Sequence, residues 1–126
     1  MSAAYVDSSV VLAHLFGQHA EAELRSRASA FRTLYAATLL EAEVLSAIAR
    51  ERIARDLVML NGIRWVLPVR ALRPEIERVL AAGYVRGADC LHLATALYLA
   101  PDPAELTFLT LDERQQSVAQ ALGFVV

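Results

Sequence analysis

Hydrophobic residues fall into short runs along the chain, and these runs alternate with longer segments in which apolar residues recur at helical spacing. The short runs are rich in β-branched or aromatic residues, which is typical of buried parallel strands. The pattern predicts five strands, at Ala3–Val6, Leu34–Ala37, Trp65–Val69, Thr107–Leu111 and Phe124–Val126. Strands that alternate with helices favour an α/β fold with a central, largely parallel sheet.

The longer segments predict seven helices, and the residues at their ends agree with that prediction. Pro74 lies where a first helical turn tolerates proline, and Gly83 and Gly123 lie where helices commonly stop. The predicted helices are Ser8–Phe16, Ala20–Ala30, Leu39–Arg52, Ala54–Gly62, Pro74–Ala82, Ala88–Leu99 and Glu113–Leu122.

The chain is long enough for one hydrophobic core, and we interpret residues 1–126 as a single domain. Apolar residues make up 56% and charged residues 21%, which excludes a disordered chain. No apolar run approaches the roughly 20 residues that cross a bilayer. No export signal is apparent, so we expect a cytoplasmic protein without a membrane partner. Cys90 is the single cysteine, which excludes an internal disulfide and a cysteine zinc site.

The charge of the chain does not by itself indicate a nucleic-acid partner. The formal net charge is -2, whereas nucleic-acid binders are commonly basic. All twelve basic residues are arginine, the side chain best suited to forked phosphate contacts. Codon usage in a GC-rich genome accounts for most of that preference, so charge leaves the partner open.

Two acidic residues follow predicted strands directly. Asp7 comes after the first strand and Asp112 after the fourth, and a helix begins after each. Aspartate at such a place commonly caps the helix that follows. Ligands of open parallel sheets, however, bind outside the carboxyl ends of the strands. The two acids are therefore candidates for one site as well as for capping.

A third acid lies within the apolar face of its helix. At about 100° per residue, Glu43 falls between Leu39 and Ala47 on the face that should pack against the core. A carboxylate in that position is expected to be paired, protonated or bound to a cation. Glu41 lies nearer the edge of the face, and an error of one residue in the helix phase would exchange the two glutamates.

A fourth acid opens a helix that is apolar nearly all round. Asp89 stands in the first turn, where a negative charge suits the helix dipole, and this alone explains it structurally. His92 lies three residues later on about the same face. We interpret it as a buried histidine with satisfied hydrogen bonds rather than as a metal ligand.

Four carboxylates at one site would repel one another unless cations neutralised them. Mg²⁺ or Mn²⁺ suits such a site, because both prefer oxygen ligands and Mg²⁺ is commonly held by a few carboxylates, waters and substrate phosphates. Sites of this kind hydrolyse phosphodiesters. If Asp7, Glu43, Asp89 and Asp112 converge, a metal-dependent nuclease is therefore the function that their chemistry favours.

The chain resembles the PIN domains, and among them the short ribonuclease toxins of VapBC-type toxin–antitoxin pairs. The resemblance rests on the order and spacing of four segments, which together extend over nearly the whole chain. They are Tyr5-Val6-Asp7-Ser8-Ser9, Leu40-Glu41-Ala42-Glu43-Val44-Leu45, the run from Arg86 to Ala96, and Phe108-Leu109-Thr110-Leu111-Asp112.

The resemblance implies a three-layer fold with a parallel sheet of about five short strands between helices. It implies that Asp7, Glu43, Asp89 and Asp112 form the catalytic site and hold one or two Mg²⁺ or Mn²⁺ ions. It further implies endonucleolytic cleavage of RNA, a homodimer, and an antitoxin whose C-terminal segment covers or enters the active site. By the same resemblance, the hydroxyls of Ser9 and Thr110 would orient carboxylates or waters.

Two arginines are candidates for contacts with the RNA backbone. Arg86 and Arg114 flank the acids in sequence, although ordinary solvated surface arginines would occupy the same positions. The chain is more acidic than some members of the family, so its RNA-binding residues are not evident from charge alone.

Several other functions remain as alternatives. A phosphatase with an aspartate nucleophile would need an acid two residues after Asp7, where this chain has Ser9, and also a lysine. A receiver-like domain would need the same lysine, and the chain has none. A PIN fold kept only for binding would be expected to have lost one of the acids. A PIN nuclease of RNA maturation is the last alternative, although the short chain favours the toxin.

The segment from Ile53 to Leu67 is unusually apolar and could serve a partner helix. Core packing is the simpler explanation for most of its residues. Trp65 is the residue to test at an interface, because aromatic side chains concentrate binding energy.

Overall fold

The computed structural model describes residues 2–17, 21–52 and 57–126. In those residues the chain forms four strands, seven α-helices and one short 3-10 helix. In chain order they are β1 (Ala3–Val6), α1 (Ser8–Leu15), α2 (Glu21–Ser29), β2 (Thr33–Ala37), α3 (Thr38–Glu51), α4 (Val58–Asn61), β3 (Ile63–Val66), α5 (Arg73–Ala82), α6 (Gly87–Leu99), η1 (Pro103–Glu105), β4 (Thr107–Leu109) and α7 (Glu113–Leu122).

The four strands form one parallel sheet in the order β3-β2-β1-β4. The chain therefore steps outward from β1 to β2 and β3, and then returns to place β4 on the opposite side of β1. The point where strand order reverses in a parallel sheet leaves a crevice at the carboxyl ends of the strands. Here that point lies between β1 and β4, which places it beside the residues that follow these two strands.

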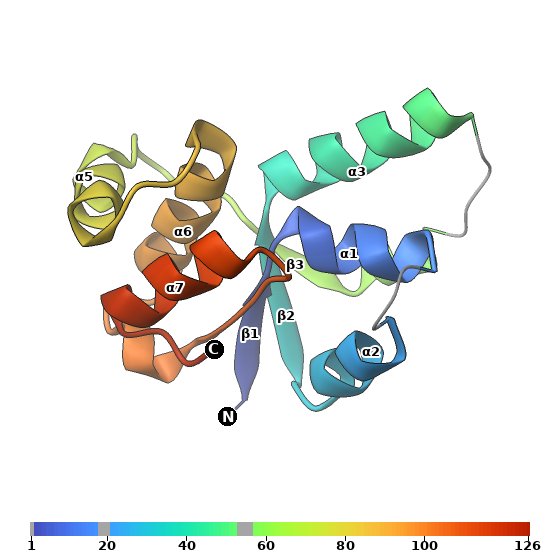
Figure 1. Cartoon of the computed structure of the whole chain (residues 1–126), viewed down its shortest axis with the longest axis horizontal. Helices are drawn as coiled ribbons and strands as arrows, with labels where there is room; N and C mark the ends of the chain where they lie inside the picture. Colours follow the sequence, from blue (N-terminus) through green and yellow to red (C-terminus); the bar gives the residue numbers. More distant parts are fainter. Residues whose placement is uncertain (1, 18–20, 53–56) are drawn as a thin grey trace.

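Helices cover both faces of the sheet, so the fold has three layers (Figure 1). Helices α1, α2 and α3 lie on one side and α5, α6 and α7 on the other. This separation follows from the strand order, because right-handed crossovers that run in opposite directions along a sheet place their helices on opposite faces. The prediction of an α/β fold with a parallel sheet between helices is confirmed.

Each face of the sheet has its own hydrophobic core, because successive side chains of a strand point to opposite faces. On β1, Ala4 and Val6 pack in the core with α1 and α3, whereas Tyr5 packs in the core with α6. On β4, Phe108 and Leu109 divide in the same way. The central strand β1 is therefore buried on both faces, and a polar residue at its end is positioned by rigid surroundings.

The strand predicted at Leu34–Ala37 begins one residue earlier, at Thr33, and the strand predicted at Thr107–Leu111 ends two residues earlier, at Leu109. Two other predicted strands differ more. The strand predicted at Trp65–Val69 begins earlier and ends earlier, at Ile63–Val66, because Pro68 lacks the N–H of a ladder and Val69 is 90% exposed. The strand predicted at Phe124–Val126 is reduced to one parallel bridge between Thr107 and Val125. The sheet thus has four strands in the described residues, not about five.

The helices lie close to their predicted positions. Pro74 stands in the first turn of α5 and Gly83 caps its end, while Gly123 caps α7 with a left-handed φ of 107°. The predicted helix Ala54–Gly62 is confirmed only over Val58–Asn61, since residues 54–56 lie outside the described part of the chain, as do Ile53 and the predicted helix start at Ala20. No helix among the described residues is sufficiently long and apolar to span a membrane.

The apolar segment that begins at Ile53 contributes mainly to the core, as its simpler interpretation predicts. Leu60 and Ile63 are buried with α1 and α3, and Leu57 and Trp65 pack against them from the outside. Val58 is exposed. Because Trp65 is only partly buried, a role of this side chain at an interface stays a prediction.

Helix α3 offers a direct test of the fold. Leu40 and Leu45 both belong to this helix, but Leu40 is fully buried whereas Leu45 is 41% exposed. Leu40→Ala should lower the free energy of unfolding by about 2–5 kcal/mol because it leaves a cavity, and Leu45→Ala should lower it by less than about 1 kcal/mol. Urea denaturation followed by circular dichroism measures both. Equal losses in the two variants would contradict this packing.

Candidate active site

The Asp7 side chain is buried at the carboxyl end of β1, with only 3% of the residue exposed. Its two carboxylate oxygens accept hydrogen bonds from different hydroxyls. Ser9 Oγ donates to Oδ1 at 2.6 Å, and Thr110 Oγ1 donates to Oδ2 at 2.5 Å. Asp7 also caps α1, since the backbone N–H of Val10 donates to Oδ1 at 3.4 Å. Asp7 therefore caps the helix, but capping alone does not require the carboxylate to be buried.

The two hydroxyls join the chain after β1 to the chain after β4. The Leu111 N–H donates to Ser9 Oγ at 3.0 Å, and the Asp112 N–H donates to Thr110 Oγ1 at 3.0 Å. Ser9 and Thr110 therefore orient the Asp7 carboxylate, while backbone groups orient their hydroxyls in turn. This arrangement agrees with the expectation that these hydroxyls orient a carboxylate.

Asp112 caps helix α7, and its Oδ1 accepts the N–H of Gln115 at 2.8 Å. Gln115 is fully buried, with Oε1 3.0 Å from the Thr110 hydroxyl and Nε2 donating to the Asp89 carbonyl oxygen at 3.2 Å. This glutamine connects the first turns of α7 and α6. Its burial was not predicted from the sequence, although the spacing Asp112-x-x-Gln115 is that of a capping box.

Asp89 stands in the first turn of α6 with a partly exposed side chain. Arg86 Nε lies 3.8 Å from its Oδ2, but Arg86 is 80% exposed, so this pair contributes little to stability. Arg114, the other candidate for RNA contact, donates from Nη1 to the Tyr84 carbonyl oxygen at 3.5 Å. Both arginines are exposed and lie close in sequence to the acids.

Glu43 points from α3 toward α6, where its Oε1 lies 2.8 Å from Nε2 of His92. The other ring nitrogen of His92 lies 3.0 Å from the Tyr5 hydroxyl. Glu41 is exposed, so the structure supports the phase in which Glu43 and not Glu41 faces the other acids. Pairing is one of the three states expected for the Glu43 carboxylate, and the buried His92 has both ring nitrogens at hydrogen-bond distance from a partner, as expected.

The pKa shifts of three of the acids reflect their burial and their neighbours. Burial raises the pKa of Asp7, although the Ser9 and Thr110 hydroxyls oppose that shift. Burial raises the pKa of Asp89 as well, and the neighbouring carboxylates of Asp112 and Glu43 raise it further. The hydrogen bond with His92 lowers the pKa of Glu43. The fold therefore brings acids from α3, α6 and the ends of β1 and β4 to one region.

The donor chemistry of this region suits a hard cation, because it consists of carboxylates and hydroxyls, and the carboxylates of Asp112 and Glu43 raise the pKa of Asp89. Within the described residues, however, no three acidic, histidine or cysteine side chains are arranged to hold one metal ion. The oxygens of Asp7 face hydroxyls and Glu43 faces His92, so a cation would require some carboxylates to turn. Glu43 and Asp89 are partly exposed and have room to do so.

The cavities of the molecule differ in their relation to the acids. An apolar cavity of about 350 Å³ is lined by Phe31, Arg32 and Gly62, which precede β2 and β3, and it lies at the opposite, amino end of the sheet. A more polar hollow of about 570 Å³ is lined by Tyr84, Glu113 and Arg114. Of these two, the second lies beside the first turn of α7, the helix that Asp112 caps.

The acids provide a test by titration. In the metal-free protein, Asp7 and Asp89 should titrate above the ordinary aspartate pKa and Glu43 below that of glutamate. Asp112→Asn should lower the pKa of Asp89, because it removes a neighbouring charge while asparagine still caps α7. NMR titration of the carboxyl carbons measures these values. An Asp89 pKa that does not respond to Asp112→Asn would contradict the convergence of the acids.

The same shifts set the pH dependence of stability. A group whose pKa is raised on folding makes the native state less stable as the pH rises from its unfolded pKa through its folded pKa, which applies to Asp7 and Asp89. Glu43 acts in the opposite direction. Its contribution to stability is present above the unfolded pKa and is lost as the pH falls through the lowered folded value.

Comparisons with known proteins agree with the fold and with the sequence motifs. A family model described as the PIN domain matches residues 4–121, a span that contains all four acids. Searches of curated proteins and of solved structures found no significant match.

Proposed function

The chain belongs to the PIN domain family, a family of nucleases, and from this premise we propose that it is a metal-dependent endoribonuclease that acts as the toxin of a toxin–antitoxin pair. The observation that carries this proposal is the buried Asp7 carboxylate. It stands where strand order reverses, and its two oxygens accept hydrogen bonds from Ser9 and Thr110.

Burial of Asp7 is difficult to explain by structure alone. A helix cap needs only one carboxylate oxygen near the first N–H groups, and it can remain exposed. Burial disfavours the charged form, and the raised pKa of Asp7 records that cost. Residues with such perturbed pKa values concentrate at functional sites. The acids around Asp7 support a site that is completed by a cation.

In this proposal Asp7, Glu43, Asp89 and Asp112 hold Mg²⁺ or Mn²⁺. The bound metal supplies an activated water and neutralises the charge that develops on the scissile phosphate. Ser9 and Thr110 keep the Asp7 carboxylate in one orientation, while Asp112 and Gln115 hold the start of α7 against the acids. Carboxylates that are already held in the reactive geometry lower the entropic cost of reaching the transition state.

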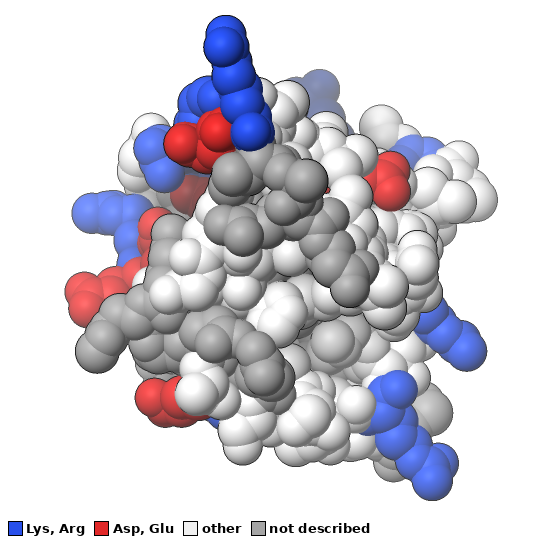
Figure 2. Space-filling view, turned by 90° about the vertical axis from the view of Figure 1, so that its right-hand side faces the viewer, with Lys and Arg blue, Asp and Glu red and all other residues white. Residues whose placement is uncertain are grey.

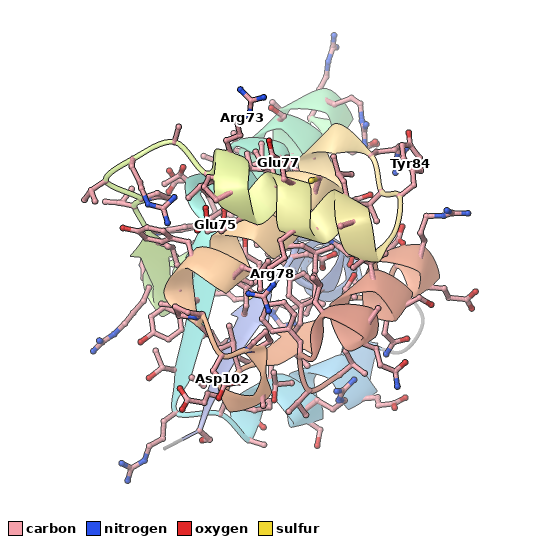
Figure 3. All side chains as sticks on the ribbon, turned by 90° about the vertical axis from the view of Figure 1, so that its left-hand side faces the viewer. Arg73, Glu75, Glu77, Arg78, Tyr84 and Asp102 are labelled. Atoms are coloured by element: carbon pink, nitrogen blue, oxygen red, sulfur yellow. The ribbon has the colours of Figure 1, made fainter. Side chains whose placement is uncertain are left out.

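Contacts with the RNA are proposed for the surface around Tyr84 and Arg114. Tyr84 is 69% exposed, lies at the edge of the face formed by α5, α6 and α7 (Figure 3), and shares the polar hollow with Arg114. Unpaired bases stack on exposed aromatic rings, and arginines contact phosphates. On the face formed by α1, α2 and α3, arginines stand apart around the rim (Figure 2).

The toxin assignment adds three further proposals, which rest on the four sequence segments shared with short ribonuclease toxins. A cognate antitoxin binds the chain, and its C-terminal segment covers the acids. Two copies of the chain form a homodimer. The protein acts in the cytoplasm, where its RNA substrate is present.

The first test is RNA cleavage by Asp7→Asn. Asparagine keeps the shape of Asp7, and the Thr110 proton can turn to Gln115 Oε1, so the fold should be retained. Loss of the charge should lower metal-dependent cleavage by on the order of 100-fold or more. Cleavage of total RNA is measured with Mg²⁺, with Mn²⁺ and with EDTA. Asp102→Asn is the matched control, because Asp102 caps η1 on the surface by a similar hydrogen bond.

Each result has a defined meaning. Metal-dependent cleavage that is lost in Asp7→Asn and kept in Asp102→Asn supports the nuclease. Equal cleavage by wild type and Asp7→Asn would contradict it and would favour a PIN fold kept for binding. Expression in a bacterial host tests the toxin role separately. Wild type should arrest growth and Asp7→Asn should not, whereas cleavage without growth arrest would favour a nuclease of RNA maturation.

The second test concerns Arg114. Arg114→Ala in the Asp7→Asn background should weaken binding of a single-stranded RNA and reduce the magnitude of the salt dependence by about 0.7 in the log–log slope, as expected for one lost phosphate contact. Fluorescence anisotropy of a labelled oligonucleotide at several salt concentrations measures both. Arg73→Ala serves as control, since Arg73 pairs with Glu77 on the exposed side of α5 (Figure 3). Equal effects of the two variants would exclude a specific role for Arg114.

A further inference from the structure

A chain of hydrogen bonds connects the interior of the sheet to Glu43. His92 is only 1% exposed and lies between Tyr5 of β1 and Glu43 of α3. Tyr5 Oη is 3.0 Å from His92 Nδ1, and His92 Nε2 is 2.8 Å from Glu43 Oε1. The connected residues are 87 and 49 positions apart in sequence, respectively. The direction of these two hydrogen bonds depends on where the protons of Tyr5 and His92 lie.

The backbone determines the role of the Tyr5 hydroxyl. The Ala37 N–H donates to Tyr5 Oη at 3.1 Å, so the oxygen already accepts one hydrogen bond. A phenol keeps its proton at neutral pH, so the hydroxyl has one hydrogen bond to donate. Nδ1 of His92 is the acceptor at hydrogen-bond distance. Thr95, also near this hydroxyl, uses its own proton on the Leu91 carbonyl oxygen at 2.7 Å.

The role of His92 follows from that of Tyr5. A neutral imidazole has one donor nitrogen and one acceptor nitrogen, and the hydrogen bond at one nitrogen selects the tautomer. If Nδ1 accepts from Tyr5, the proton lies on Nε2 and is donated to Glu43 Oε1. The histidine then offers a fixed N–H to the carboxylate, which also has the Ser8 hydroxyl as a hydrogen-bonding neighbour. The carboxylate oxygens still have lone pairs for a cation.

We propose that Tyr5 and His92 are positioning residues that orient the Glu43 carboxylate for a divalent cation, through a hydrogen-bond chain that begins at the Ala37 N–H. The proposal rests on the metal-dependent function proposed above. Glutamate has a long side chain with many rotamers, and Glu43 is 31% exposed. An N–H held rigidly in the core restricts those rotamers, and hydrogen bonds of this kind around metal ligands raise metal affinity by about 10–100-fold.

Tyr5 is itself held by its neighbours, which makes the chain rigid. Its ring stacks on Phe108 of β4 with centroids 5.2 Å apart and 11° between the planes. It also meets the His92 ring edge to face at 6.0 Å. Removal of the Tyr5 hydroxyl should therefore leave the ring in place and change only the hydrogen bonds.

The proton positions can be measured on the metal-free wild type. Long-range ¹H–¹⁵N NMR of the histidine ring distinguishes the two neutral tautomers and the imidazolium, and His92→Gln assigns the signals. The proposal expects the proton on Nε2, with Nδ1 as the acceptor of the Tyr5 hydroxyl. A ring that carries its proton on Nδ1 and has none on Nε2 would overturn it. This measurement requires no RNA cleavage, so its outcome is separate from that of the proposed function.

The effect on the cation is measured by Mn²⁺ binding, with calorimetry and without RNA. Tyr5→Phe should weaken Mn²⁺ binding about 10-fold, because His92 is then free to move its proton to Nδ1. Tyr98→Phe is the matched control, since its hydroxyl accepts only the exposed Val69 N–H among the hydrogen bonds described. It should leave Mn²⁺ affinity unchanged.

Two variants of His92 separate positioning from packing. Glutamine can place an N–H where Nε2 of histidine lies, whereas leucine fills the space without a donor. Mn²⁺ affinity should be largely retained in His92→Gln and reduced about 10-fold or more in His92→Leu, while both have similar melting temperatures. Equal Mn²⁺ affinity in folded wild type, Tyr5→Phe and His92→Leu would overturn the proposal. If a variant does not fold, the wild-type tautomer still decides.

Discussion

The hydrogen bonds between the Asp7 carboxylate and the hydroxyls of Ser9 and Thr110 are the interaction on which the acidic region depends. They join the residue after β1 to the residue after β4, and these two segments are 103 positions apart in sequence. Parallel pairing of β1 and β4 brings the segments together. The buried charge is tolerated because each oxygen has a donor, and the same donors hold the carboxylate in one orientation.

The alternation of side chains along β1 also places Tyr5 in contact with the helices on one face of the sheet. Tyr5 and Val6 point to opposite faces of the sheet, so Tyr5 packs with α6, whereas Val6 packs with α1 and α3. Asp7 connects to β4 and α7 through Thr110 and Gln115, and Tyr5 connects to α6 and α3 through His92. A single central strand thus organises acids that come from four different parts of the chain.

Stability and the proposed activity make opposite demands on this region. The raised pKa values of Asp7 and Asp89 mean that the metal-free native state is less favourable for their charged forms than the unfolded state is. Groups that serve structure alone are not expected to keep such a penalty. A cation would remove it by neutralising the carboxylates, so binding of metal and stability of the fold should be linked.

The α/β class, the parallel sheet and the place of Asp7 at the end of β1 were predictable from the sequence, because hydrophobic period and helix caps are local properties. Asp112 caps α7, as its sequence context predicts, but β4 ends three residues before it, at Leu109. The sequence also placed Glu43 on the inner face of α3. The helical period does not show what that face meets, so the partnership of Glu43 with His92, the buried Gln115 and the direction of the Tyr5 hydroxyl followed only from tertiary structure. The last predicted strand failed for the same reason. Its residues have strand character, but packing turns Phe124 into the core and leaves Val125 to pair at one position.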